Sequence, residues 1–282
     1  MNSKYKTIKY KKNKSTNLED QVSIEEPLEM VVRYKKNNEW IDNSISITMR
    51  TPKFYTVKGS DWLGNDDEDL IVGLLFCEGI IHNISEIKKV ELLGDKVGKF
   101  DLQNKIRATL NSGENLNIKN LRRNFLTNSS CGVCGKTSMD SLEIICKTKI
   151  NKDSPKIKSS LITKIPDLLR KSQSEFSKTG GIHASALFNK EGKPLVTKED
   201  VGRHNALDKV IGYSLKNSIF DTKNQFIACS GRLSFELVQK TLMANIGFLI
   251  GVGAPTSLAI DLAKRFDMTL IGFVKSDSFN IY

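Results

Sequence analysis

Two cysteines with two residues between them are the side chains of this sequence best placed to do chemistry. Cys131 and Cys134 belong to the segment Ser-Ser-Cys-Gly-Val-Cys-Gly-Lys at residues 129–136. Thiols at this spacing can share a metal ion, form a disulfide or pass on a sulfur atom. The glycines favour an exposed, flexible loop, and Lys136 favours the reactive thiolate. The motif therefore suits a thiol that meets two partners in turn, and a persulfide is one of the reversible states that a thiolate can carry.

Two other interpretations of this motif stay open. It could be half of a zinc site, but a structural zinc needs four ligands. The sequence offers only single cysteines and three scattered histidines as further ligands. It could also be a thioredoxin-like redox pair, which should follow a buried strand, whereas the approach at residues 124–129 is polar. We expect no metal of the protein's own.

The other cysteines and the N-terminus indicate the cellular compartment in which the protein functions. The odd count of five cysteines argues against a disulfide scaffold. Cys77 and Cys229 lie in apolar runs and are expected to be buried. The first residues lack the apolar core of a secretory signal, and no apolar run is long enough for a membrane span. We expect a cytoplasmic protein without a membrane partner.

A predicted helix start at residues 199–209, Glu-Asp-Val-Gly-Arg-His-Asn-Ala-Leu-Asp-Lys, could bind an anion. Asp200 is expected to cap the helix. Arg203 and His204 would then crowd the first turn, where the backbone field attracts anions. Asp208 lies four residues after His204 and is expected to orient its ring. The alternative is an ordinary solvated helix start.

Three loops that follow expected strands extend the predicted binding region. Residues 226–274 alternate between strand and helix patterns with short links, which implies parallel strands joined by right-handed crossovers. Ligands of such sheets bind at the carboxyl ends of the strands. The paired glycines of Thr-Gly-Gly-Ile-His-Ala at 179–184 could approach an oxyanion or a planar ring. The candidate binding residues for a nucleotide-like ligand are Gly180, Gly181, His183, Arg203, His204, Ser230, Gly231, Arg232, Ser234, Thr256, Phe273, Val274, Lys275, Ser276, Asp277 and Ser278.

Charge and composition divide the chain. The formal net charge is +11, and six of the first fourteen residues are lysine. We expect a basic disordered tail at 1–22, a small α+β domain at 23–125, a flexible loop with the cysteines at 126–160 and an α/β cofactor-binding domain at 161–282. In the small domain, residues 25–34 are expected to form an edge strand paired with 45–49, before a helix at 67–78. The positive excess favours anionic partners, but no nucleic-acid motif is present.

These segments together resemble the formate dehydrogenase accessory sulfurtransferase family, of the FdhD type. The resemblance rests on Cys-Gly-Val-Cys-Gly-Lys, Thr-Gly-Gly-Ile-His-Ala, Glu-Asp-Val-Gly-Arg-His-Asn-Ala-Leu-Asp-Lys and Ser-Gly-Arg-Leu-Ser-Phe-Glu. It continues through Ala-Pro-Thr-Ser-Leu-Ala and Leu-Ile-Gly-Phe-Val-Lys, and it runs from Glu25 to Tyr282.

The resemblance implies a fold, a cargo and partners. It implies a cytidine-deaminase-like, three-layer C-terminal domain and a homodimer. It also implies that Cys131 takes persulfide sulfur from a cysteine desulfurase. The sulfur would pass to the molybdenum cofactor, a bis-molybdopterin guanine dinucleotide, before that cofactor enters formate dehydrogenase. Cys134 would assist release through a disulfide, or only protect Cys131.

Two departures from the family pattern qualify the resemblance. Residues 53–64 look like an insertion before the expected helix. Where deaminases have His-x-Glu, this chain has His183-Ala184-Ser185, without the general acid/base glutamate, and no Pro-Cys-x-x-Cys half-site follows. The fold can therefore be shared while the reaction is not. A non-catalytic chaperone for the cofactor and a zinc-binding regulatory module are the alternative functions.

Overall fold

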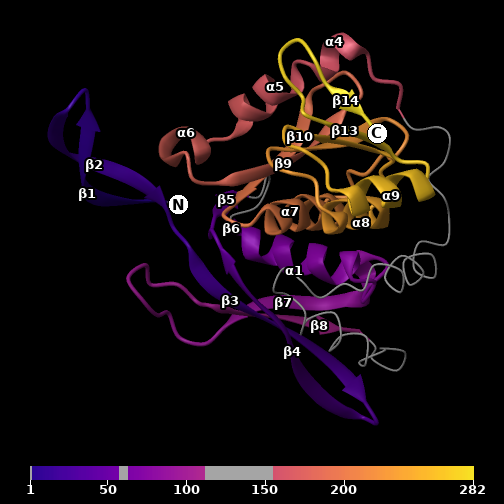
Figure 1. Cartoon of the computed structure of the whole chain (residues 1–282). Coiled ribbons are helices and arrows are strands. Elements are labelled where there is room, and N and C mark those ends of the chain that lie inside the picture. Colours follow the sequence, from indigo (N-terminus) through magenta and orange to yellow (C-terminus); the bar gives the residue numbers. More distant parts are fainter. Residues whose placement is uncertain (1, 57–62, 112–154) are drawn as a thin grey trace.

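Two lobes stack on each other across a pair of packed helices (Figure 1). The computed structural model describes residues 2–56, 63–111 and 155–282. Among these residues, no helix is long and apolar enough to cross a bilayer. The strands are β1 (Asn2–Lys11), β2 (Lys14–Ser23), β3 (Glu26–Lys36), β4 (Glu39–Arg50), β5 (Phe54–Thr56), β6 (Leu63–Asn65), β7 (Ile87–Leu93), β8 (Lys105–Leu110), β9 (His183–Asn189), β10 (Pro194–Asp200), β11 (Gln225–Cys229), β12 (Phe248–Gly251), β13 (Thr269–Gly272) and β14 (Asn280–Ile281). The helices are α1 (Asp66–Cys77), the 3-10 turn η1 (Ile84–Glu86), α4 (Ser159–Ile162), α5 (Ile165–Ser172), α6 (Phe176–Thr179), α7 (Arg203–Lys216), α8 (Phe235–Met243) and α9 (Ser257–Arg265).

The N-terminal lobe is a four-stranded sheet covered by α1. Its strand order is β4-β3-β8-β7, in which β3 is parallel to β8 and the other pairs are antiparallel. Leu70 and Ile71 of α1 are fully buried in one cluster with Leu28 and Ile106 of the sheet. The prediction that residues 25–34 form an edge strand was wrong, because β3 is paired on both sides. Its many buried side chains are typical of an interior strand.

A short strand pair leads into α1, at the apparent insertion. β5 pairs with β6 in antiparallel register, and residues 57–62 between them lie outside the described residues. Asn65 then caps α1, since its side chain accepts a hydrogen bond of 2.7 Å from the N–H of Asp67. The acidic first turn of α1 suits the positive end of the helix dipole.

The C-terminal lobe is a six-stranded sheet with helices on both faces (Figure 1). The order is β10-β9-β11-β12-β13-β14, and β11, β12 and β13 run parallel as the sequence predicted. β9, β10 and β14 are antiparallel additions to this core. Helices α7, α8 and α9 pack on one face, whereas α4 and α5 pack on the other. Because both faces are covered, β11 is buried at every residue, which explains its continuous apolar run.

The lobes meet where α1 crosses α7, at two glycines. A Cβ atom on Gly73 would lie 1.9 Å from the carbonyl oxygen of Asp208, and one on Gly212 would lie 1.9 Å from that of Asp69. Neither position has room for a side chain. The two glycines therefore let the helix backbones touch, which fixes the lobes closely against each other.

Buried ion pairs also hold the lobes together. Lys198 of β10 lies 2.7 Å from Asp66 and 2.7 Å from Asp69, both on α1. Lys209 of α7 lies 2.6 Å from Asp200. Its ammonium group also donates a 2.8 Å hydrogen bond to the carbonyl of Thr51, from the N-terminal lobe. Because buried charges need partners, these contacts specify one docking of the lobes.

The N-terminal residues differ from the disordered tail that composition predicted. β1 and β2 pair over their whole length as a hairpin, which extends away from the N-terminal sheet (Figure 1). Lys12 and Asn13 turn the chain with positive φ angles of 48° and 61°, as in a type I′ turn. The composition argument missed that the lysines before this turn alternate with strand-forming residues such as Tyr5 and Ile8.

Candidate pocket at the carboxyl edge of the sheet

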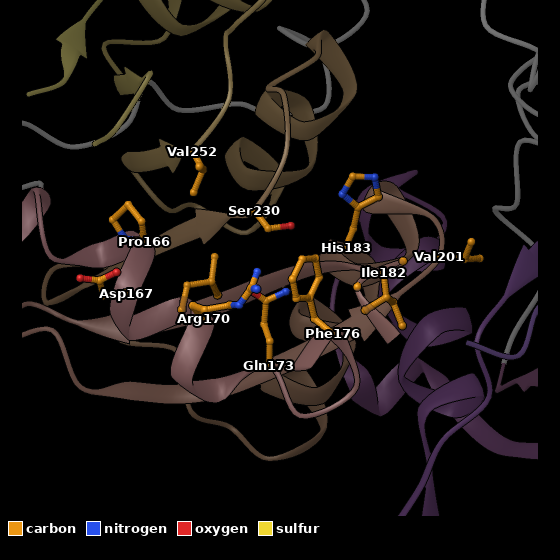
Figure 2. A pocket seen from close by; sticks show the side chains of 13 residues that line it. Pro166, Asp167, Arg170, Gln173, Phe176, Ile182, His183, Val201, Ser230 and Val252 are labelled. Atoms are coloured by element: carbon orange, nitrogen blue, oxygen red, sulfur yellow. The ribbon is translucent and has the colours of Figure 1, made fainter. Parts of the chain in front are cut away.

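A pocket of about 590 Å³ opens where β9 begins and where β10, β11 and β12 end (Figure 2). These ends share one edge, because β9 runs antiparallel to both β10 and β11. Four of the predicted binding residues line it: Gly180, Gly181, His183 and Ser230. The opposite wall is formed by Pro166, Asp167, Leu169, Arg170, Gln173 and Phe176. The volume falls in the range of sites for small organic ligands.

The loops after β11, β12 and β13 lie side by side along this edge. The N–H of Gly253 donates to the carbonyl of Gly231 at 3.1 Å, and the N–H of Phe273 donates to the carbonyl of Gly253 at 3.1 Å. The sequence expectation that these loops meet at one edge is therefore confirmed. Arg232 stands exposed on the first of them.

His183 lies between the pocket and the loop after β11. Ala184, the next residue along β9, donates its N–H to the hydroxyl of Ser230 at 2.9 Å. A Cβ atom on Gly231 would lie 3.2 Å from Nδ1 of His183, so the missing side chain lets the ring lie against the loop. Burial lowers the pKa of His183, and the guanidinium groups of Arg203 and Arg232 lower it further. The imidazole is therefore neutral at pH 7.

A second histidine faces the start of α8. Nε2 of His204 lies 3.1 Å from the hydroxyl of Ser234 and 3.8 Å from the carboxylate of Glu236. Burial, followed by the charges of Arg203 and Lys240, lowers the pKa of His204 to about 4. A neutral ring can accept the hydroxyl hydrogen of Ser234 at Nε2.

Two expected roles of aspartates near this helix were wrong. Asp208 does not orient His204; its carboxylate binds Lys240 at 2.8 and 2.9 Å. Asp200 does not cap α7, which begins after Gly202. The strand β10 continues to Asp200, and its buried carboxylate accepts from the N–H of Gly202 at 2.8 Å and from Lys209 at 2.6 Å. Both carboxylates instead form buried ion pairs with Lys209 and Lys240, because a charged ammonium group is a stronger partner than a neutral group.

The helix wall of the pocket was not foreseen from the sequence. The guanidinium group of Arg170 lies over the ring of Phe176, 3.8 Å from its centre. Gln173 is only 4% exposed, and its Nε2 has no hydrogen-bond partner in the part of the chain that the structure describes. A signal was present in the sequence, because Asp167, Arg170, Gln173 and Phe176 recur at every third residue after Pro166.

The remaining predicted residues lie outside the lining of the pocket. The hydroxyl of Thr256 accepts from the N–H of Ala259 at 3.4 Å and so caps α9. Val274 is 3% exposed and packs in the apolar cluster under α4 and α5, so its side chain is unsuited to ligand contact. Phe273 and residues 275–278 are exposed on the loop after β13.

The thiols divide into two kinds. Cys77 and Cys229 are buried and unpaired, as the sequence predicted. Burial raises the pKa of Cys229 to about 11 and raises that of Cys77 well above its ordinary value. Both are therefore poor nucleophiles at neutral pH. Cys131, Cys134 and Cys146 lie outside the described residues, among which no cluster of metal ligands occurs.

We expect the imidazole of His204 to titrate near pH 4. Proton NMR of its ring hydrogens, assigned with a His204→Gln variant, measures this midpoint. The unfolded chain takes up the same proton near a pKa of about 6.5, so folding stability should fall as the pH drops from about 6.5 toward 4. A midpoint at or above the ordinary histidine value would contradict the neutral ring described above.

The fold and the pocket define a mixed α/β protein with a cavity of small-ligand size at the carboxyl edge of a mixed sheet whose core strands β11, β12 and β13 are parallel. A comparison with known protein families identifies the family within this class. The model of the FdhD/NarQ family matches residues 44–282, and the chain belongs to this family.

Curated relatives share most of their length with this chain. The sulfur carrier protein FdhD of Thermoplasma volcanium is 40% identical over 264 residues, which cover 94% of this chain and 88% of that protein. The protein of the same name from Saccharolobus solfataricus is 36% identical, over 99% of this chain and 95% of its own.

A crystal structure from Desulfotalea psychrophila, described as a formate dehydrogenase accessory protein, shares the fold. Its TM-score is 0.69 at 22% sequence identity, and the match covers 99% of this chain and 96% of the other.

Proposed function

We propose that this protein carries sulfur as a persulfide on Cys131 and delivers it to a guanine-dinucleotide form of the molybdenum cofactor. Membership of the FdhD/NarQ family and the sulfur carrier name of its relatives support the general role. The observation that carries the assignment to Cys131 is the state of the described thiols. Cys77 and Cys229 are buried with raised pKa values, so neither suits the carrier role. Of the other three cysteines, Cys131 and Cys134 form the glycine-flanked Cys-x-x-Cys motif, whereas Cys146 stands alone in the sequence.

Loading is an exchange between two sulfur–sulfur bonds. The thiolate of Cys131 attacks the terminal sulfur of a persulfide on a cysteine desulfurase. The bond between the donor's two sulfurs breaks, a new one forms on Cys131, and the donor cysteine leaves as a thiolate. Neither oxidant nor reductant is needed for this step.

Release requires two electrons, which Cys134 can supply. Its thiolate attacks the inner sulfur of the Cys131 persulfide and forms a disulfide, while the terminal sulfur leaves as hydrosulfide. This ion replaces an oxide ligand of molybdenum, which takes the hydrosulfide proton and one solvent proton and leaves as water. A dithiol reductant then restores both thiols.

The carboxyl edge of the C-terminal sheet is the proposed place for the cargo. Apolar side chains and the neutral His183 contribute to the lining of its pocket, whereas Arg232 stands exposed on the adjoining loop. The charge of Arg203 lowers the pKa of both His183 and His204. Helix N-termini add unpaired N–H groups there. This division suits a ligand with a flat ring and a phosphate chain. We retain the candidate binding residues on this basis, except the side chain of Val274.

The partners and the finer fold assignment belong to the same proposal. The sulfur donor is a cysteine desulfurase, and the recipient is the catalytic subunit of formate dehydrogenase, in the cytoplasm. The protein works as a homodimer. A cytidine-deaminase-like C-terminal domain is compatible with a sheet covered by helices on both faces.

Replacing Arg232 with alanine should weaken the binding of guanosine diphosphate. A hydrogen bond to a charged group typically contributes roughly 1.5–3 kcal/mol, so the affinity should fall about tenfold to over a hundredfold. Calorimetric titration of the full chain measures this change. Persulfide loading on Cys131 should stay unaltered, because loading needs only the donor and the thiol.

The matched control is Lys264→Ala, which removes one exposed charge at the far end of α9. It should leave nucleotide affinity unaltered. An unaltered affinity in Arg232→Ala would move the phosphate site away from this loop. If Arg232→Ala lost persulfide loading on Cys131 as well as nucleotide binding, the two functions would share one site.

A further inference from the structure

The helix wall of the pocket offers two features suited to a flat ring. Arg170 and Phe176 stack at 3.8 Å and thereby hold a planar guanidinium group at the pocket. Heteroaromatic rings stack well on aromatic and guanidinium planes. Pro166, Leu169 and Ile182 add apolar surface around this stack (Figure 2).

A buried hydrogen-bond donor lies beside the stack. Gln173 lines the pocket and is 4% exposed, and its Nε2 finds no acceptor among residues 2–56, 63–111 and 155–282. A buried amide N–H that is left unsatisfied is costly, so such groups are rare in folded proteins. A ring carbonyl that enters the pocket would supply the missing acceptor.

Charge favours a ring over a phosphate at this wall. The carboxylate of Asp167 offsets the charge of Arg170 on the same side of the pocket, and His183 opposite is neutral. Arg232 is exposed on the loop after β11, where the preceding residue, Gly231, lies against the ring of His183. A nucleotide would therefore place its ring against α5 and its phosphates toward that loop.

From these contacts we infer that Arg170, Gln173 and Phe176 form a subsite for a planar bicyclic heterocycle with a ring carbonyl. The inference rests on the proposed function, whose cargo contains two such rings, guanine and pterin. Both carry a carbonyl next to a ring N–H, which is the edge that a glutamine amide can read. Stacking supplies affinity, and Gln173 supplies orientation.

The test is calorimetric titration of the full chain with guanosine and, separately, with neopterin. Both probes are uncharged, so a changed attraction for phosphate cannot imitate the effect. Gln173→Met keeps the side-chain length and removes the amide, which should weaken binding about tenfold. Arg170→Met and Phe176→Leu remove the stack and should weaken binding roughly tenfold to a hundredfold.

Lys171→Met is the matched control, because it removes one charge from the same helix without lining the pocket. Thermal unfolding of each variant reports on folding, and the exposed position of Arg170 keeps the test open if Gln173→Met fails to fold. A loss confined to guanosine or to neopterin supports the subsite and identifies the ring.

Unaltered affinity for both probes in the Arg170 and Gln173 variants would overturn the subsite. In that case the loss of guanosine diphosphate binding in Arg232→Ala would still support the proposed cargo. If the unmodified protein bound neither the two rings nor the diphosphate, the proposed cargo would fail, and the subsite with it.

Discussion

Replacing Cys131 with alanine is expected to abolish persulfide loading. The reason is chemical, since the reaction needs a thiolate, and the described thiols of Cys77 and Cys229 are buried with raised pKa values. Mass spectrometry of the full chain after incubation with a desulfurase and cysteine measures the loss. The unmodified protein should gain one sulfur atom on the peptide that contains Cys131.

Cys134→Ala is the informative companion to this variant. It should load persulfide normally but release hydrosulfide slowly, because the second thiol provides the two electrons for release. Equal release by Cys134→Ala and the unmodified protein would leave Cys134 a protective role only. A Cys131→Ala protein that still supported full formate dehydrogenase activity would favour the cofactor chaperone over the sulfur carrier.

Replacing Lys209 with methionine is expected to cost about 3–5 kcal/mol of folding stability, because it leaves a buried carboxylate without its partner. The ammonium group is fully buried and lies 2.6 Å from Asp200. Burial alone would lower its pKa, but the carboxylates of Asp200 and Asp66 outweigh burial and raise it. The lysine therefore stays charged. Denaturant unfolding of the full chain, followed by circular dichroism, measures the change.

Lys190→Met is the control for this prediction. Lys190 is exposed at the end of β9, and its ammonium group contacts only the side chain of Asn224 among the described residues. A surface change of this kind usually alters stability by less than about 0.5 kcal/mol. A loss of similar size in both variants would mean that the buried Lys209–Asp200 pair contributes little to folding stability.

Local patterns were sufficient to predict the parallel core of the C-terminal lobe. The buried run of Phe226–Cys229 and the short links to α8 and α9 leave few other arrangements. The same patterns put the loops after β11, β12 and β13 at one edge. They failed for residues 2–23, where composition indicated disorder but pairing across a type I′ turn produced a hairpin.

The sequence by itself determined the family, the position of the Cys-x-x-Cys motif and the loops that meet at the carboxyl edge of the sheet, because these depend on residue type and short spacing. Only the tertiary structure decided the partners of Asp200 and Asp208, which are lysines on other turns and elements. It also decided that α5 supplies a wall of the pocket and that Gly73 and Gly212 let the lobes touch. Such contacts join residues far apart in the chain, and local periodicity carries no information about which distant surface a side chain will meet.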